Sequence, residues 1–421
     1  MNSYLKKHAF CKPQISEPVN PGTQIICVIP CFNEEKLLDT LQALALCDQP
    51  TCHVEVIVVL NSGVQHDQTI LDQNLKTRDE FLCWKNNRTQ DKITWHLIHI
   101  ADLPEKHAGV GLARKIGMDE AVARFEMIGA DGVILCFDAD SLCDKNYLKA
   151  VYHHFFEFHP ASPGCSIYFE HPLNSEVYGD EIIQAITQYE LHLRYYNLCM
   201  RYCRLPYAFH TIGSSMAVRS SAYQKQGGMN RRKAGEDFYF LHKIIALGNF
   251  TELNSTCVMP SPRVSDRVPF GTGKSVIDFL ALQQKKYLTY NFNSFQLIAG
   301  IVKLVPQFRY KGTELILDSL HDSSYSALIV GWLNQEKFEE ALDSMRRNSA
   351  SDSSFYKRFF VWLDAFKVLK LLHFLRDHGI ANSPVMQELC MLESAETNKF
   401  VLDEDPIIQL KNLRDYERTK I

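Results

Sequence analysis

Short apolar runs alternate with amphipathic segments along the first third of the chain. Four runs that are rich in β-branched residues predict buried strands, at 25–29, 54–60, 95–100 and 133–137. Between them, apolar residues recur at helical spacing, at 33–44 and 110–125. Strands and helices in this order predict an α/β fold with a mostly parallel central sheet, right-handed crossovers and flanking helices.

The pattern loosens after about residue 150. It predicts a strand at 166–169, helices at 181–203 and 237–247, and a small-residue segment with a strand-like end at 211–219. Residues 261–272 are rich in Pro, Arg and Gly and predict a loop. From 276 onward the pattern is helical and more polar, without β-rich runs. We therefore expect a loose N-terminal lead-in at 1–22, an α/β domain at 23–275 and a mainly helical region at 276–421.

The composition is ordinary for a soluble globular protein, with 22% charged residues. The formal net charge of -4 provides no broad basic field, which argues against nucleic acid as the main partner. The 13 cysteines are scattered singly, as is usual for reduced thiols in a cytosolic protein. No apolar run is long enough to span a membrane, and no signal core follows Lys6 and Lys7. We expect a cytoplasmic protein, with a peripheral membrane contact left open.

Two aspartates, Asp138 and Asp140, directly follow the apolar run 133–137. Residues two apart in an extended segment point to the same side. Open α/β sheets bind ligands at the carboxyl ends of their strands. Paired carboxylates favour a hard divalent cation, which commonly bridges the phosphates of a nucleotide. The alternative is a solvated turn that caps the next helix, and the pair alone leaves both interpretations open.

The turn from the first strand into its helix has the sequence Pro30-Cys-Phe-Asn-Glu34. Unsatisfied backbone N–H groups and the positive end of the helix dipole make such a turn a natural cradle for a nucleotide. Capping of the helix by Asn33 explains the same residues equally well.

A second acidic pair, Glu236 and Asp237, opens a helix later in the chain. Acids at a helix start are favoured by the dipole alone. The functional alternative is a general base aimed at an acceptor hydroxyl. Asp237 is our choice for that base, with Glu236 orienting it or holding the acceptor.

The Pro-rich loop carries two arginines, Arg263 and Arg267, and a stretch that resembles a P-loop. A guanidinium in this loop can stabilise the charge of a departing nucleoside diphosphate, although an exposed arginine without a role fits as well. The stretch Gly271–Ser275 does not make a P-loop, because Val268 occupies the position of the required glycine and no buried strand precedes it. Loop glycines that allow closure over a donor fit better.

An ordered series of motifs between residues 24 and 275 resembles the family 2 glycosyltransferases with the GT-A fold. The matching segments are Val28–Glu34, Gly109–Gly117, Phe137–Asp140, Gly213–Arg219 followed by Gly227-Gly228, and Gly235–Asp237. The resemblance implies that the first segment embraces the base and ribose of a sugar nucleotide. It implies that Asp138 and Asp140 form the metal motif and that Asp237 is the catalytic base. With the arginines of the Pro-rich loop and the asparagine that ends the second strand, the residues that we expect at the donor are Pro30, Phe32, Asn33, Glu34, Asn61, Gly109, Arg114, Asp138, Arg263 and Arg267.

The chain departs from the family at two points. The second strand of family members often ends in acidic residues that read the base, whereas this strand ends in Asn61-Ser-Gly. An asparagine still hydrogen-bonds a base or ribose edge, so the base stays undecided. The Gln-x-x-Arg-Trp motif of processive members is missing, which disfavours a polymer-extruding synthase.

The resemblance predicts a metal-dependent glycosyltransferase that moves a sugar from a nucleoside-diphosphate sugar to an acceptor hydroxyl. The acceptor is a glycan, a lipid-linked molecule or a small molecule. We expect Mn²⁺ or Mg²⁺ as cofactor, inversion at the anomeric carbon and non-processive transfer. Two alternatives stay open: a nucleotidyltransferase, whose usual Gly-rich, Lys-containing loop is missing here, and a non-catalytic scaffold that binds a sugar nucleotide or glycan.

Overall fold

The computed structural model describes residues 2–88, 92–232, 235–265, 271–282, 286–311, 325–396 and 399–420. The chain divides into two compact units. The first contains Met1–Ile183, Thr211–Ile277 and Glu417–Ile421, and the second contains Gln184–His210 and Asp278–Tyr416. Residues 184–210, which we expected within the α/β domain, therefore belong to the helical unit.

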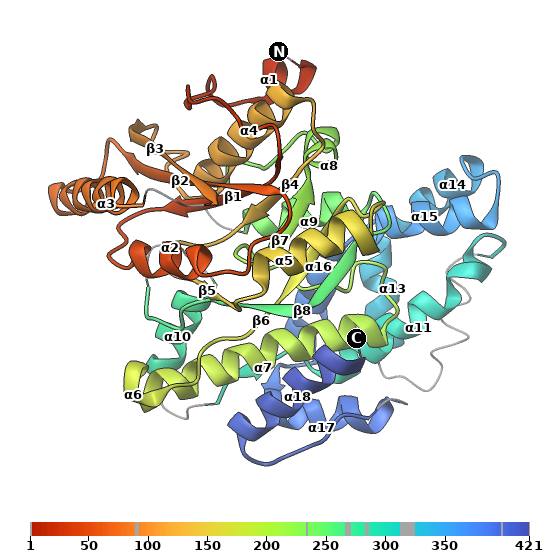
Figure 1. The fold of residues 1–421 in the computed structure, drawn as a ribbon. Helices are drawn as coiled ribbons and strands as arrows, with labels where there is room; N and C mark the ends of the chain where they lie inside the picture. The colour runs from red at the N-terminus through yellow and green to blue at the C-terminus, as the bar shows by residue number, and fades with distance from the viewer. Residues whose placement is uncertain are drawn as a thin grey trace. The chain divides into compact units, whose positions relative to one another are not determined.

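The first unit is built on a sheet of eight strands within the described residues, in the order β3-β2-β1-β4-β7-β6-β8-β5 (Figure 1). The strands are β1 Thr23–Cys31, β2 His53–Gly63, β3 Ile93–Leu103, β4 Val133–Cys136, β5 Leu142–Cys143, β6 Gly164–Phe169, β7 Met216–Arg219 and β8 Thr251–Met259. The four strands from β3 to β4 are parallel, as predicted. The other half is mixed, because β7 pairs antiparallel with both β4 and β6, while β6 and β8 are parallel.

Successive side chains of β1 and β2 point to opposite faces of the sheet, and both faces are buried. Ile25, Cys27 and Ile29 of β1 share a core with the apolar residues of α2 and with Phe81. On the other face α4 packs so closely that a Cβ added at Gly117 would lie 2.4 Å from Val28 Cγ1. This contact explains why α4 buries nearly all of its first fifteen residues, charged ones included.

The helices of the first unit are α1 Ser3–His8, α2 Leu37–Ala45, α3 Gln68–Asn86, α4 Val110–Ile128, α5 Tyr147–His153, α6 Ser175–Tyr178, α8 Ser220–Lys225 and α9 Glu236–Ile245, with a π-helical turn at His154–Phe158. Two further helices, α7 Asp180–Tyr202 and α10 Thr272–Ala281, begin in the first unit and continue into the second. The sequence pattern did not predict α3 or β8. The buried residues of α3 are Asn74, Thr77 and Phe81, so its inner face is mostly polar and gives no apolar periodicity.

Two predictions for the N-terminal part of the chain were wrong. We expected Pro30 to end the first strand, but β1 continues to Cys31. Its pairing with β4 stops at Val28. Pro30 therefore lies beyond the paired segment, and its missing N–H costs no hydrogen bond to β4. The lead-in is not loose either, because Tyr4 and Leu5 of α1 are buried and the Tyr4 hydroxyl donates a hydrogen bond of 2.6 Å to Asp119 of α4.

The second unit is helical, with a two-residue antiparallel strand pair that the sequence pattern did not predict. Its elements are α11 Phe292–Phe308, α13 Ser326–Gln335, α14 Phe338–Arg347, α15 Asp352–Trp362, α16 Ala365–Asp377, α17 Val385–Ala395, most of α18 Pro406–Lys420, β9 Leu288–Thr289 and β10 Ser383–Pro384. Phe308, Phe338, Phe359 and Trp362 pack together in its core. Across the described residues of both units, none of the helices combines the length and apolar character needed to cross a bilayer.

A buried ion pair joins α4 to β2. Arg124 and Glu55 are both completely buried, and the guanidinium donates to both carboxylate oxygens, with Nη2 lying 3.1 Å from Oε1. Burial by itself raises the pKa of Glu55, but His96 and Arg124 lower it more, and the resulting pKa is about 2. The pair therefore holds Glu55 ionised at neutral pH.

Glu55→Gln should lower the free energy of unfolding by roughly 3–5 kcal/mol, because it leaves the Arg124 guanidinium buried without a counter-charge. Replacing both residues by Leu and Met should cost much less. Since folding lowers the pKa of Glu55, its stabilisation is complete above the usual value of 4.5 and is lost as the pH falls toward about 2. Urea melts of the parent and of Glu55→Gln, recorded from about pH 7 down to about pH 3, should therefore show a smaller difference in the free energy of unfolding at the acidic end. A constant difference would contradict this account.

Candidate active site

Most of the predicted site residues come together where β1, β2 and β4 end. Asp138 and Asp140 follow β4, and the loop after β1 carries Phe32 to Glu34. These neighbouring parallel strands end at one edge of the sheet, which is where open α/β sheets bind ligands. Helix α9 brings Glu236 and Asp237 to the same edge, because α4 links it to β4 through Arg114.

Arg114 bridges two of the acidic residues. Its Nη2 lies 2.5 Å from Asp138 Oδ1, and its Nη1 donates to Glu236 Oε1. Arg114 and Glu236 are almost completely buried, whereas the Asp138 side chain is 35% exposed. In this ion-pair chain Asp138 is therefore accessible to solvent, whereas Glu236 is buried.

Two glycines make room for this bridge. A Cβ at Gly213 would lie 2.4 Å from Arg114 Nη1, so only glycine fits under the guanidinium. A Cβ at Gly111 would lie 2.2 Å from the Arg232 carbonyl oxygen, so glycine lets the segment before α9 approach α4. Both glycines lie in segments that the sequence assigned to the family, and the structure gives them a steric reason.

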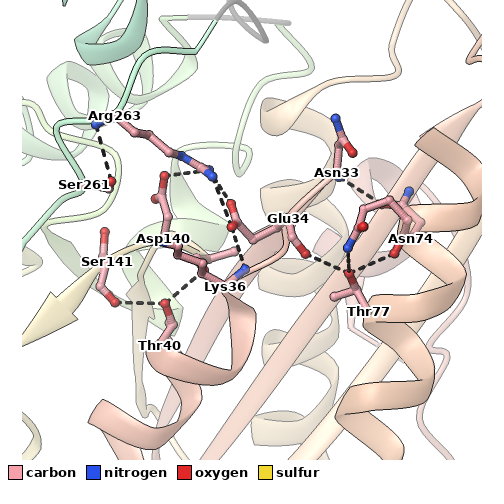
Figure 2. Close-up of polar contacts among 12 residues, drawn as sticks. Asn33, Glu34, Lys36, Thr40, Asn74, Thr77, Asp140, Ser141, Ser261 and Arg263 are labelled. Atoms are coloured by element: carbon pink, nitrogen blue, oxygen red, sulfur yellow. Dashed lines mark hydrogen bonds and ion pairs between the residues drawn. The ribbon is translucent and has the colours of Figure 1, made fainter. Parts of the chain in front are cut away.

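Arg263 bridges the other two acidic residues, as Figure 2 shows. Its Nη1 lies 3.1 Å from Glu34 Oε1, its Nη2 donates to Glu34 Oε2, and the same Nη2 lies 2.8 Å from Asp140 Oδ2. Thr40 of α2 fixes the backbone here, because its hydroxyl lies 2.9 Å from the Ala139 carbonyl oxygen and 3.0 Å from that of Ser141. The Asp138–Asp140 segment is thus held in place from three sides.

The site holds more acid than base. Glu34, Asp138, Asp140, Glu236 and Asp237 face two guanidinium groups among the described residues, which leaves an excess of negative charge. Burial raises the pKa of Asp140 to about 7 despite Arg263, and Asp138 and Glu34 add to the rise. Burial likewise raises the pKa of Glu236 to about 7 against the effect of Arg114. Among the described residues, this site therefore carries more negative than positive charge.

Asp237 lies at the start of α9, next to the Glu236 that Arg114 holds. Its Oδ1 accepts a hydrogen bond of 2.7 Å from the backbone N–H of Phe238. Burial is the main cause that raises the pKa of its carboxyl, and the charge of Asp138 contributes. A raised pKa makes a carboxylate a stronger base, which suits proton removal from a hydroxyl.

The loop after β1 is fixed by two residues that the sequence analysis did not single out, Asn74 and Thr77 of α3. The backbone N–H of Asn33 lies 2.9 Å from Asn74 Oδ1, and Asn74 Nδ2 lies 3.2 Å from the Asn61 carbonyl oxygen. The Thr77 hydroxyl donates to the Glu34 carbonyl at 2.7 Å (Figure 2). Asn33 has a left-handed backbone, with φ of 47°, which asparagine tolerates. No apolar pattern marks these helix residues, so only the fold reveals them.

The remaining predicted donor residues have separate places. The ring of Phe32 lies 4.6 Å from that of His66, and Asn61 is buried at the end of β2. Gly109 is the N-cap of α4, so the N-terminus of this helix opens beside Arg114. Arg267 and Val268 lie outside the described residues. In the described part of the chain, no group of three or more His, Cys, Asp or Glu side chains is arranged to hold a metal ion.

Comparison with known proteins identifies the class. The model of glycosyl transferase family 2 matches residues 26–226, and that of glycosyl transferase family group 2 matches residues 133–334. Each model covers just under half of the chain and both describe family 2-type enzymes, so the chain is a family 2-like glycosyltransferase. It is a glycosyltransferase with a GT-A fold, in which a mostly parallel sheet flanked by helices is followed by a helical region. No curated protein matches the chain.

Two solved structures illustrate the range of similar folds. S. aureus TarS 1-349, solved in complex with UDP-GlcNAc, is 16% identical, with a TM-score of 0.40 over 79% of this chain and 89% of TarS 1-349. GalNAc-T7, solved with UDP, GalNAc and Mn2+, is 11% identical, with a TM-score of 0.37 over 73% of this chain and 55% of GalNAc-T7. The assignment rests on the family models and on the sheet topology rather than on these superpositions.

Gly213→Ala should displace the Arg114 guanidinium, which is bonded at both ends and buried, so it cannot move without releasing Asp138 or Glu236. A misplacement of about 1 Å in a catalytic site costs roughly 100-fold in activity. We expect kcat/KM for sugar transfer to fall by about that factor. Gly331→Ala is the matched control, because no atom lies within 4 Å of the added Cβ. Parental activity in folded Gly213→Ala would show that the position of Arg114 does not matter.

Proposed function

We propose that this glycosyltransferase moves a sugar from a nucleoside-diphosphate sugar to an acceptor hydroxyl, with a divalent cation, inversion at the anomeric carbon and one transfer per encounter. The observation that carries the proposal is the gathering of five carboxylates around two guanidiniums where β1 and β4 end. Such a surface cannot hold a diphosphate until positive charge is added. It suits a ligand that arrives together with a cation.

The residues fit Mn²⁺ or Mg²⁺. Asp138 and Asp140 offer hard oxygen ligands, and a cation that bridges a nucleotide needs only one or two protein carboxylates, because phosphates and waters complete its shell. When bound, the cation would neutralise charge on the leaving nucleoside diphosphate. The excess of carboxylates among the described residues supports a site that takes up a cation.

The other residues have roles that follow from their contacts. Asp237 takes the proton of the acceptor hydroxyl, which then attacks the anomeric carbon from the face opposite the leaving group. Glu236 is buried and bonded to Arg114, so of its two expected roles the orienting one fits, and holding the acceptor does not. Arg263 lies beside Asp140 and supplies positive charge near the diphosphate. Phe32 and Asn61 border the space for the base.

One base in this position supports inversion, because a retaining displacement would need a second nucleophile. The missing Gln-x-x-Arg-Trp motif supports non-processive transfer. A nucleotidyltransferase would release pyrophosphate and a non-catalytic scaffold would release nothing. A metal-dependent release of nucleoside diphosphate from the donor therefore separates all three.

Asp237→Asn should lower the transfer rate by roughly 10²–10⁴-fold, because the amide cannot accept the hydroxyl proton. Donor binding should persist, since Asp237 does not hold the diphosphate. Single-turnover transfer and a thermal-shift titration with donor measure the two effects. Asp39→Asn, an exposed aspartate on α2, is the control. If Asp237→Asn transferred sugar at the parental rate, another group would be the base.

A thermal-shift screen of nucleoside diphosphates with and without Mn²⁺ should select one base, because stabilisation follows ligand affinity. In Asp140→Asn the metal-dependent part of the shift should be lost. Equal shifts with and without Mn²⁺ in the parent would rule out the metal dependence while leaving the nucleotide specificity intact.

A further inference from the structure

Glu34 was predicted to touch the donor, but its carboxylate is committed elsewhere. Its side chain is 1% exposed, and it accepts from both terminal nitrogens of Arg263. Its Oε1 also accepts from the backbone N–H of Lys36, at 2.9 Å. A carboxylate with these partners and no contact with solvent has no surface to offer a ligand. Its effect on the reaction must pass through Arg263.

The two ends of this ion-pair unit are unequal. Glu34 grips Arg263 with both oxygens, in the two-point geometry that makes guanidinium–carboxylate pairs strong. Asp140 lies 2.8 Å from Arg263 Nη2, the nitrogen that also donates to Glu34. The side chains of Arg263 and Asp140 are 29% and 23% exposed, so the Asp140 contact is the accessible one. Arg263 can therefore release Asp140 and stay anchored to Glu34; Figure 2 shows its contacts with both carboxylates.

A further observation supports an exchangeable contact between Arg263 and Asp140. The Nε of Arg263 is buried and has no hydrogen-bond partner within the described residues. A buried unsatisfied donor is unfavourable, so this position of Arg263 is not fully satisfied. In contrast, both terminal nitrogens of Arg263 donate to the Glu34 carboxylate.

We propose that Glu34 is a positioning residue that keeps Arg263 beside Asp140 and retains it when Asp140 is released, and that the Arg263–Asp140 ion pair competes with the divalent cation and sets its affinity. The inference rests on the proposed function, because it takes the cation to bind at Asp140. In this view Arg263 stands in for the cation before the donor arrives. It then leaves Asp140 and remains on Glu34, beside the diphosphate.

The test is a titration of the full-length protein with Mn²⁺ alone, followed by the electron paramagnetic resonance signal of free aqueous Mn²⁺. Arg263→Met removes the competing charge, so Mn²⁺ should bind roughly tenfold more tightly, the size of effect expected from one neighbouring charge. Glu34→Gln weakens the anchor, so Arg263 stays on Asp140 and the affinity for Mn²⁺ should fall by about several-fold. Because Glu34→Gln also removes one negative charge, which by itself weakens cation binding, the result for Arg263→Met carries the test.

Three further variants complete the design. Arg263→Lys keeps the charge and should stay closer to the parent than Arg263→Met. Arg309→Met removes an arginine that is also ion-paired, to Asp352, and should leave Mn²⁺ binding unchanged. If Arg263→Met does not fold because Glu34 is left buried and unpaired, Arg263→Gln replaces it, with the same expected sign.

The outcomes separate this inference from the function on which it rests. Equal or weaker binding in a folded Arg263→Met or Arg263→Gln, when the parent binds Mn²⁺, overturns the competition and leaves the metal dependence standing. If neither the parent nor these variants bind Mn²⁺ at millimolar concentration, the competition at Asp140 is overturned, and the thermal-shift screen with nucleoside diphosphates decides the metal dependence separately. Binding by the variant alone supports the competition in its strongest form.

Discussion

Carboxylates cannot be gathered at the end of a buried strand unless positive charge is buried with them, and the site depends on how this chain meets that condition. Arg114 enters from α4 and Arg263 from the loop after β8, and each ties one aspartate of the metal motif to a buried glutamate. The two guanidiniums leave the carboxylates fixed but not neutralised. The Asp138–Asp140 segment is therefore held in place by ion pairs on both sides.

Helix α4 provides most of this order, because it is buried on all sides and carries charges that must be paired. Arg114 serves the site, while Arg124 is paired with Glu55 of β2. Asp119 accepts hydrogen bonds from the hydroxyls of Tyr4 and Tyr223, which fastens the N-terminal helix to α4. The same helix thus joins the N-terminal segment, the sheet and the catalytic edge. Its tight packing on β1 places Arg114 with little freedom.

The arginine contacts of Asp138 and Asp140 bear on whether the acidic pair binds a metal at all. If salt links had balanced the local charge, the pair would read as a structural element of the fold. Among the described residues two guanidiniums face five carboxylates, and burial raises the pKa values of Asp140 and Glu236 to about 7 even though Arg263 and Arg114 lower them. The arrangement resembles a charged site in its ligand-free form more than a completed salt-bridge network.

The sequence alone determined the parallel half of the sheet, α4, α9 and the order of the family motifs, because buried parallel strands and helix starts leave strong local patterns. It also selected the residues that meet at the sheet edge. It could not show that Glu34 and Glu236 are closed off by Arg263 and Arg114, because partners 229 and 122 residues apart leave no local signal. Nor could it reveal Asn74 and Thr77, whose polar side chains face inward on α3. Local pattern reports which face of an element is buried, whereas only the tertiary structure decides which charge is buried against which.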